Sequence, residues 1–239
     1  MITLPSPEKY EDPIRYLRDC HALILQLLLS LENLATNVKP GELVASLSAQ
    51  HDWQEILEFF EVSGPEHEKD EEEAVFNPLE RMLPHMGFQS ATTPIRFLIE
   101  GHEALITKTS ETVETWRAIL IGPKENIEPQ EQSFLSAIKE MVALYREHIA
   151  AEEPKTYVVA DAKFSPRQKI EAMQTIQFQH KKRLSMPMMG FDRSNMTPVI
   201  GNLEYLTDAS AFGGDTNQFE TFEPMTIERK SRESPETEE

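Results

Sequence analysis

The chain of 239 residues lacks the features that mark several large classes of protein. Its single cysteine, Cys20, excludes an intramolecular disulfide framework and a cysteine-based zinc site, and it fits a reducing compartment. The first residues, MITLPSPEKYEDP, have neither the charged-then-apolar build of a signal peptide nor a small-residue cleavage site. The most apolar run, ALILQLLLSL at 22–31, is too short to cross a bilayer. We therefore expect a soluble, cytoplasmic protein.

Positive charge is also scarce. The chain has 23 Lys and Arg residues against 41 Asp and Glu residues, a formal net charge of −18. Such a polyanion is repelled by phosphate backbones and by anionic membrane surfaces, so we expect neither a nucleic-acid nor a membrane partner. The carboxylates are compatible with cation binding, but they more commonly serve solubility, and charge alone does not separate the two roles.

Strand signals are almost absent, apart from TYVVA at 156–160, which can equally prolong a helix. Apolar residues instead recur at helical spacing and predict four amphipathic helices, over 12–37, within 41–83, over 92–118 and over 128–153. Asp12 is the expected N-cap of the first helix. Ser63-Gly64-Pro65 interrupts the second helix, which either kinks at Pro65 or restarts there with Ser63 as cap. Prolines 78, 84 and 154 are expected to end helices.

Four such helices with short connections predict an all-α protein, an up-down four-helix bundle that spans residues 1–162. A short accessory helix, capped at Ser165, is expected within 163–183. Residues 184–239 are polar and weakly periodic. Because they cannot bury enough apolar surface to offset their ordering entropy, we expect a largely disordered tail.

Four of the seven histidines each lie in the middle of one predicted helix, on its apolar face. They are His21, His67, His102 and His148. The first two are 46 residues apart, and so are the last two; Glu71 and Glu152 follow the second member of each pair by four residues. Position i+4 of a helix lies only about 40° around from position i, so each His-x-x-x-Glu pair points into the same space. The two pairs and two single histidines are therefore expected to converge in the bundle core.

A single buried histidine is more commonly a hydrogen-bonded core residue than a ligand. The repeated pattern favours a metal site, because burying the whole set unpaired would cost several kcal/mol per ionised group, and two divalent cations would remove that cost. Four imidazoles and two or more carboxylates suit iron best, with manganese and zinc as alternatives. A metal-free bundle with buried polar pairs is the opposing interpretation.

The residues beside this set receive separate predictions. Glu68 lies about 100° from His67 and can flank the same site. Tyr145 is expected to serve packing or to support the ligands from behind. The other polar residues are expected to be solvated, on the surface or outside the site; they are His51, Asp70, Glu72, Glu73, His85, Glu153 and His180.

The segments FFEVSGPEHEKDEEEAVFNPLE (59–80), IEGHEALI (99–106) and YREHIAAEE (145–153), together with His21, resemble the hemerythrin-like (HHE cation-binding) family. The resemblance covers about residues 10–160 and implies a four-helix bundle that holds a non-haem di-iron centre. It further implies two irons bridged by oxo or hydroxo and carboxylate groups. The four histidines would be terminal ligands, and Glu71 and Glu152 would be the bridging carboxylates.

Glu68 departs from the pattern of many bacterial members, which carry a second histidine at this position. The arrangement His-Glu-x-x-Glu resembles the iron-sensing hemerythrin-like domain of an F-box protein. An additional anionic ligand would stabilise Fe(III) and compete for an open position. The resemblance therefore implies sensing, storage or slow oxidase, peroxidase or catalase-like chemistry with O₂, NO or peroxide. The alternative is a regulatory module in which metal only orders the bundle and the C-terminal tail recruits a protein partner.

Overall fold

Helices are the regular secondary structure in the part of the chain that the computed structural model describes, residues 2–39, 41–44, 47–85, 92–122 and 127–185. The long helices are α1 (Pro13–Asn37), α2 (Leu47–Glu71), α4 (Thr92–Ile121) and α5 (Glu128–Glu152). Shorter elements are η1 (Pro7–Lys9), η2 (Glu72–Phe76), α3 (Asn77–His85), η4 (Glu153–Tyr157), α6 (Val158–Lys163) and α7 (Pro166–Ser185). No strand occurs within these described ranges. The predicted all-α class is confirmed.

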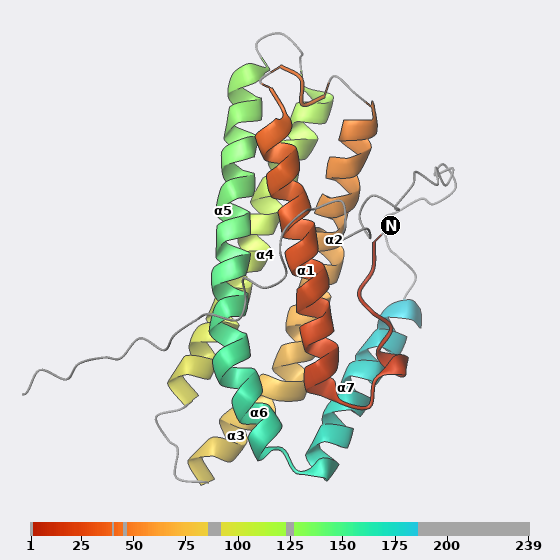
Figure 1. Cartoon of the computed structure of the whole chain (residues 1–239), viewed down its shortest axis with the longest axis vertical. Helices are drawn as coiled ribbons and strands as arrows, with labels where there is room; N and C mark the ends of the chain where they lie inside the picture. Colours follow the sequence, from red (N-terminus) through yellow and green to blue (C-terminus); the bar gives the residue numbers. More distant parts are fainter. Residues whose placement is uncertain (1, 40, 45–46, 86–91, 123–126, 186–239) are drawn as a thin grey trace, which may run out of the picture. The chain divides into compact units, whose positions relative to one another are not determined.

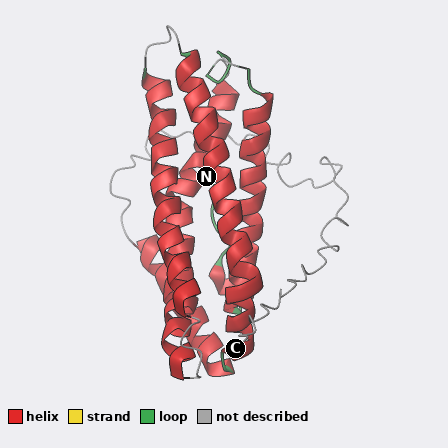
Figure 2. Ribbon diagram, turned by 90° about the vertical axis from the view of Figure 1, so that its left-hand side faces the viewer, coloured by secondary structure: helices red, strands yellow, loops and turns green. Residues whose placement is uncertain are grey.

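The four long helices form the predicted up-down bundle. α1 and α4 run in one direction and α2 and α5 in the other, so that consecutive long helices are antiparallel (Figure 1). α1 contacts α2 and α5, and α4 contacts the same two helices. Figure 2 shows the long helices side by side from a second direction. Within the described ranges, none of the helices has the length and apolar character needed to span a membrane.

Local side-chain caps explain where two helices begin. The Asp12 side chain accepts a hydrogen bond from the Arg15 N–H at 2.9 Å, as expected of the N-cap of α1. At the start of α7, Ser165 Oγ accepts from the Gln168 N–H, and the Gln168 side chain accepts from the Ser165 N–H at 2.9 Å. This reciprocal capping box confirms the predicted start of the accessory helix. α7 contacts α1, α2 and η2 and continues to Ser185, so the first two residues of the tail predicted over 184–239 are helical; the rest of that tail lies outside the described residues.

The prolines interrupt the helices less than predicted. α2 is continuous through Pro65, so the restart at Ser63 is wrong. Pro84 lies inside α3, and Pro154 lies in η4 rather than after the end of a helix. TYVVA at 156–160 prolongs the helical region, one of its two predicted outcomes. A proline in a helix interior removes one backbone hydrogen bond and costs about 3 kcal/mol, and the burial of core residues along the same helical region, such as Phe60 and Val75, offsets that loss.

Two π-helical segments stand at equivalent points of the bundle. η2 begins directly after Glu71, and η4 begins directly after Glu152. A π turn holds an extra residue and so changes the direction of the side chains that follow it. The two segments therefore alter the helix register immediately beyond the two predicted carboxylate ligands.

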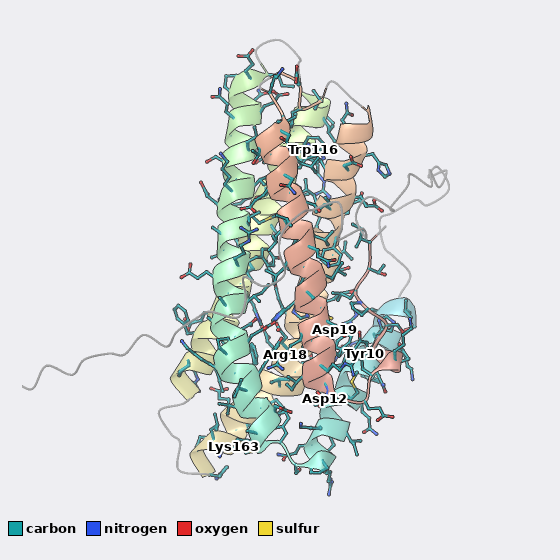
Figure 3. The ribbon with its side chains drawn as sticks, in the orientation of Figure 1. Tyr10, Asp12, Arg18, Asp19, Trp116 and Lys163 are labelled. Atoms are coloured by element: carbon teal, nitrogen blue, oxygen red, sulfur yellow. The ribbon has the colours of Figure 1, made fainter. Side chains whose placement is uncertain are left out.

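The apolar core has two parts, and the predicted site lies between them. One part includes Ile24, Leu28 and Leu105, and continues to Trp116 near one end of the bundle. The other includes Leu17 and Leu98, nearer the start of α1. Figure 3 labels Trp116 at one end of the bundle and Asp12 at the other. The histidines at 21 and 102 lie on α1 and α4 between these two apolar layers.

Candidate metal centre

Six of the seven predicted site residues form two groups of potential metal donors. One group is His21, His67 and Glu71, from α1 and α2; the other is His102, His148 and Glu152, from α4 and α5. Within each group one donor atom from every residue lies within 4.8 Å of the others. All six are buried except His148, which is partly buried. The predicted convergence of two His-x-x-x-Glu turns and two single histidines is thus present in the fold.

The two glutamates are shared between the groups. Glu71 Oε1 lies 3.2 Å from His21 Nε2 and 3.3 Å from His67 Nε2, while its Oε2 lies 3.3 Å from His102 Nε2. Glu152 is arranged the other way round. Its Oε1 lies 2.8 Å from His148 Nε2 and 3.2 Å from His102 Nε2, and its Oε2 lies 3.4 Å from His21 Nε2. Each carboxylate therefore presents one oxygen to each group.

Two further carboxylates contact His21 and His102 at Nδ1, the ring nitrogen that faces away from the donor groups. Glu153 Oε1 lies 2.9 Å from His21 Nδ1, and Glu72 Oε1 lies 2.8 Å from His102 Nδ1. A carboxylate at Nδ1 takes the N–H there and leaves the Nε2 lone pair directed at the other donors. Glu72 was predicted to be solvated, and that was wrong: only a third of its side chain is exposed. Glu153 lies outside the two groups, as predicted, but it contacts one of them.

The sequence held a signal for this pair of carboxylates. Both follow a predicted ligand directly, as Glu71-Glu72 and Glu152-Glu153. In an undisturbed α-helix two consecutive side chains point about 100° apart, so a regular helix predicts the second member of each pair away from the face of the first. The second glutamates instead belong to the π segments and reach a histidine of another helix.

Tyr157 lies at the site and was not predicted there. Its hydroxyl donates a hydrogen bond to Glu71 Oε1 and lies 3.4 Å from His21 Nε2. Its ring stacks on that of His21, with centroids 5.3 Å apart and planes at 9°. Burial, and then the Glu71 and Glu152 carboxylates, raise the pKa of Tyr157 well above its ordinary value, so the metal-free protein holds a phenol there.

Glu68 belongs to neither group of donors. It is nevertheless 3% exposed, and neither of its carboxyl oxygens has a hydrogen-bond partner among the described residues. It lines a cavity of about 10 Å³ together with His67, Glu71, His148 and Glu152, among others. Burial raises the pKa of Glu68 to about 8, because desolvation outweighs the attraction of His102.

When no metal is bound, protonated histidines of the site offset the negative charge of its glutamates. Burial opposes protonation of His102, but hydrogen bonds to Glu152, Glu71 and Glu72 outweigh it and raise its pKa to about 12. His21 behaves alike: burial lowers its pKa, but the nearby carboxylates of Glu152, Glu153 and Glu71 raise it well above the ordinary value. The same contacts lower the pKa of Glu152 to about 2 against burial and the repulsion of Glu71.

This compensation is incomplete, and the residue types fit a cation. His67 Nδ1 is buried without a hydrogen-bond partner among the described residues, and the contacts of His67 Nε2 with Glu71 and of Glu152 Oε2 with His21, at 3.3 and 3.4 Å, lack hydrogen-bond geometry. Buried polar atoms are rarely left unpaired. Imidazole nitrogens and carboxylate oxygens are the donors that divalent transition metals take, so ions at the two groups would satisfy His67 Nε2 and Glu152 Oε2.

The remaining predictions have mixed outcomes. His51 and His85 are exposed, as predicted, and His180 is partly exposed. Tyr145 is buried, and its hydroxyl lies 3.2 Å from Thr109 Oγ1. Asp70 was predicted to be solvated and is fully buried.

The reason for the burial of Asp70 is its partner on α7. Arg183 Nη1 and Nη2 donate to the Asp70 carboxylate at 2.9 and 3.0 Å. α7 lies over this side of α2, and the sequence of α2 alone did not indicate that cover. Glu73, on the same side, is partly exposed and accepts a hydrogen bond from Gln179 of α7.

Comparison with known proteins identifies the family. No curated protein and no solved structure matches the chain significantly. The family model that describes the hemerythrin HHE cation-binding domain matches residues 12–158, which include every residue of the two donor groups and Tyr157. The match begins at the N-cap of α1 and ends just beyond the π segment after α5. With its bundle fold and its two His/Glu groups, the chain belongs to the hemerythrin HHE cation-binding domain family.

Proposed function

We propose that the chain is a cytosolic non-haem di-iron protein that binds or reacts with O₂, NO or peroxide, or that senses iron or oxygen. The observation that carries this proposal is the sharing of Glu71 and Glu152 between the two histidine groups. A single ion would not use carboxylates that face two separate histidine pairs with one oxygen each, whereas a pair of ions would. Mixed nitrogen and oxygen donors favour iron, with manganese and zinc as less suited alternatives.

Iron at these positions would supply redox electrons and an open coordination position. The chain's own residues would do the rest. Glu153 and Glu72 would keep the imidazoles of His21 and His102 oriented through their Nδ1–H groups, as carboxylates behind ligating histidines do elsewhere. The apolar layers on either side would exclude bulk water.

The small cavity beside the groups supports a small ligand. Its volume of about 10 Å³ is close to the space of one water molecule. An organic substrate would not fit without rearrangement of the core, whereas O₂, NO and peroxide need little more room. Glu68 lines this cavity with both oxygens unpaired among the described residues, and we include it as an additional carboxyl group of the site that a bound cation would hold in its anionic form.

Iron loading tests the proposal. The protein is purified without oxygen, loaded with Fe(II) and freed of excess metal, and iron is then counted per chain before air is admitted and the visible spectrum recorded. We expect about two irons per chain and new absorption on oxidation. The double variant His67→Ala/Glu71→Ala should lose most of its iron.

A matched control lies on the same helix. His51 and Glu55 have the same four-residue spacing on α2, but His51 is exposed. The variant His51→Ala/Glu55→Ala should keep two irons per chain. Full iron retention in the His67/Glu71 variant would overturn the site assignment.

A second candidate function is a metal-ordered interaction module. The observation that favours it is the ion pair of Arg183 with Asp70, which ties α7 to the helical turn between His67 and Glu71. In that case iron would raise the melting temperature without any turnover of O₂ or peroxide. Oxygen consumption by the Fe(II) protein, measured beside a thermal melt, separates the two functions.

A further inference from the structure

The site is built from two equivalent halves. Positions 21 and 102, 67 and 148, 71 and 152, and 72 and 153 carry the same residue type, and each pair is 81 residues apart. The same offset relates positions 76 and 157, the last residues of the two π segments. Phe76 stacks on His102 with centroids 5.6 Å apart and planes at 19°, just as Tyr157 stacks on His21. The halves therefore match in backbone, ligand type and aromatic cover.

Two residues break this equivalence: Glu68, whose counterpart 81 residues on is Ile149 and which belongs to neither donor group, and Tyr157. Tyr157 carries a hydroxyl, and Phe76 has none. The hydroxyl oxygen contacts Glu71 Oε1 and lies 3.4 Å from His21 Nε2. It therefore lies among the donor atoms of the first group. The Glu72 and Glu153 carboxylates differ, because each contacts Nδ1 of a histidine, on the side of the ring away from the donor atoms.

The separations agree with one coordination sphere. Metal–donor bonds of about 2.0–2.2 Å put neighbouring donors of one ion about 2.8–3.6 Å apart. The distances from His21 Nε2 to Glu71 Oε1, from His67 Nε2 to Glu71 Oε1 and from His21 Nε2 to the Tyr157 hydroxyl are 3.2, 3.3 and 3.4 Å. All three fall within that window. The Tyr157 hydroxyl and Glu71 Oε1 lie closer than that, because in the metal-free protein the hydroxyl proton lies between the two oxygens.

We propose that the Tyr157 oxygen is a ligand of the metal held by His21, His67 and Glu71, and that the second position has no counterpart. This inference rests on the metal centre proposed above. The phenol O–H bond is replaced by an oxygen–metal bond, and the proton leaves to solvent. A phenolate is a hard anionic donor that suits Fe(III), so the two positions differ in their preference for ferric iron.

The test is the spectrum of the ferric protein, with two irons per chain verified first. A phenolate bound to Fe(III) gives a visible charge-transfer band, and excitation in that band enhances tyrosinate ring vibrations in the Raman spectrum. We expect both signals in the wild type and neither in Tyr157→Phe, which keeps the buried ring. In chelator competition this variant should release one of its two irons about tenfold or more readily.

Tyr145→Phe is the matched control, because Tyr145 is buried beside the cavity that His21 and Glu71 line, but its hydroxyl meets Thr109. It should keep both signals. A wild-type protein with two irons and no tyrosinate signal would overturn the inference and leave the di-iron proposal standing. A wild-type protein without stoichiometric iron would overturn both. Tyrosinate signals that persist in Tyr157→Phe would assign the ligand to another residue and also refute the inference.

Discussion

Replacing Arg183 by methionine should destabilise the protein strongly, although the residue lies near the end of the described chain. Its guanidinium makes two hydrogen bonds to Asp70, which is fully buried, and the Arg183 side chain is 18% exposed. Removing one partner of a buried ion pair costs about 3–5 kcal/mol. Burial already raises the pKa of Asp70 against the effect of Arg183, so protonation of the abandoned carboxyl limits the cost. We therefore expect about 3 kcal/mol.

Thermal unfolding of the metal-free protein, followed by circular dichroism, measures this cost. For a protein of this size, about 3 kcal/mol corresponds to a fall of about 6–12 °C in Tm. The control is Arg167→Met, also on α7, whose side chain is 88% exposed and paired with Glu171. That exposed pair is worth less than about 1 kcal/mol.

A double variant separates the abandoned charge from the lost packing. In Asp70→Asn/Arg183→Met the carboxylate that lost its partner is removed as well, so about half of the lost stability should return. The explanation by an unpaired buried carboxylate is wrong if Arg183→Met has the same Tm as Arg167→Met. It is also wrong if the double variant is no more stable than Arg183→Met.

Two other predictions concern the site. Glu153→Gln should lower iron affinity about 10–100-fold, because an amide holds the His21 Nδ1–H less firmly than a carboxylate; chelator competition measures this, and an unchanged affinity would contradict the orienting role. The metal-free protein should be most stable between about pH 4.5 and 6.5. The pKa of His102 rises from 6.5 to about 12, so its contribution is complete below pH 6.5 and is lost at alkaline pH, while the pKa of Glu152 falls from 4.5 to about 2, so its contribution is lost in acid. Melting temperatures that increase from pH 6 to 9 would refute this balance.

The sequence predicted the bundle well, because its signals are local. The apolar periodicity of the four long helices, the Asp12 cap and the Ser165 capping box all act within a few residues, and the structure has each of them. The predictions for the prolines were wrong for a non-local reason. Pro65 and Pro154 continue in helical structure because the surrounding core outweighs one lost backbone hydrogen bond each.

The site shows the same difference between features set by local sequence and features set by distant residues. His21, His67, His102 and His148 and the two shared glutamates converge because a helix of regular period directs them into the core, and that period can be read from the sequence. Asp70 could not be placed from its own helix, since its partner Arg183 comes from α7, more than a hundred residues away. The burial of Glu72 and the contact of Glu153 with His21 could not be predicted, because the regular period ends just before both residues.

The π segments connect these observations. A helix that continued at 100° per residue from Glu152 would put position 157 about 500° further on, that is, 140° away from the glutamate and so not on its face. The wider π turn holds an extra residue, which brings Tyr157 back toward Glu71 and His21 and lets Glu153 meet the Nδ1 side of the same ring. The segment after Glu71 does the same for Phe76, Glu72 and His102. The π segments therefore give His21 and His102 each a carboxylate at Nδ1 and an aromatic ring stacked on the imidazole. Because both halves share this geometry, a difference between their metals must come from the residues that differ, and the hydroxyl of Tyr157 is the difference that lies among the donor atoms.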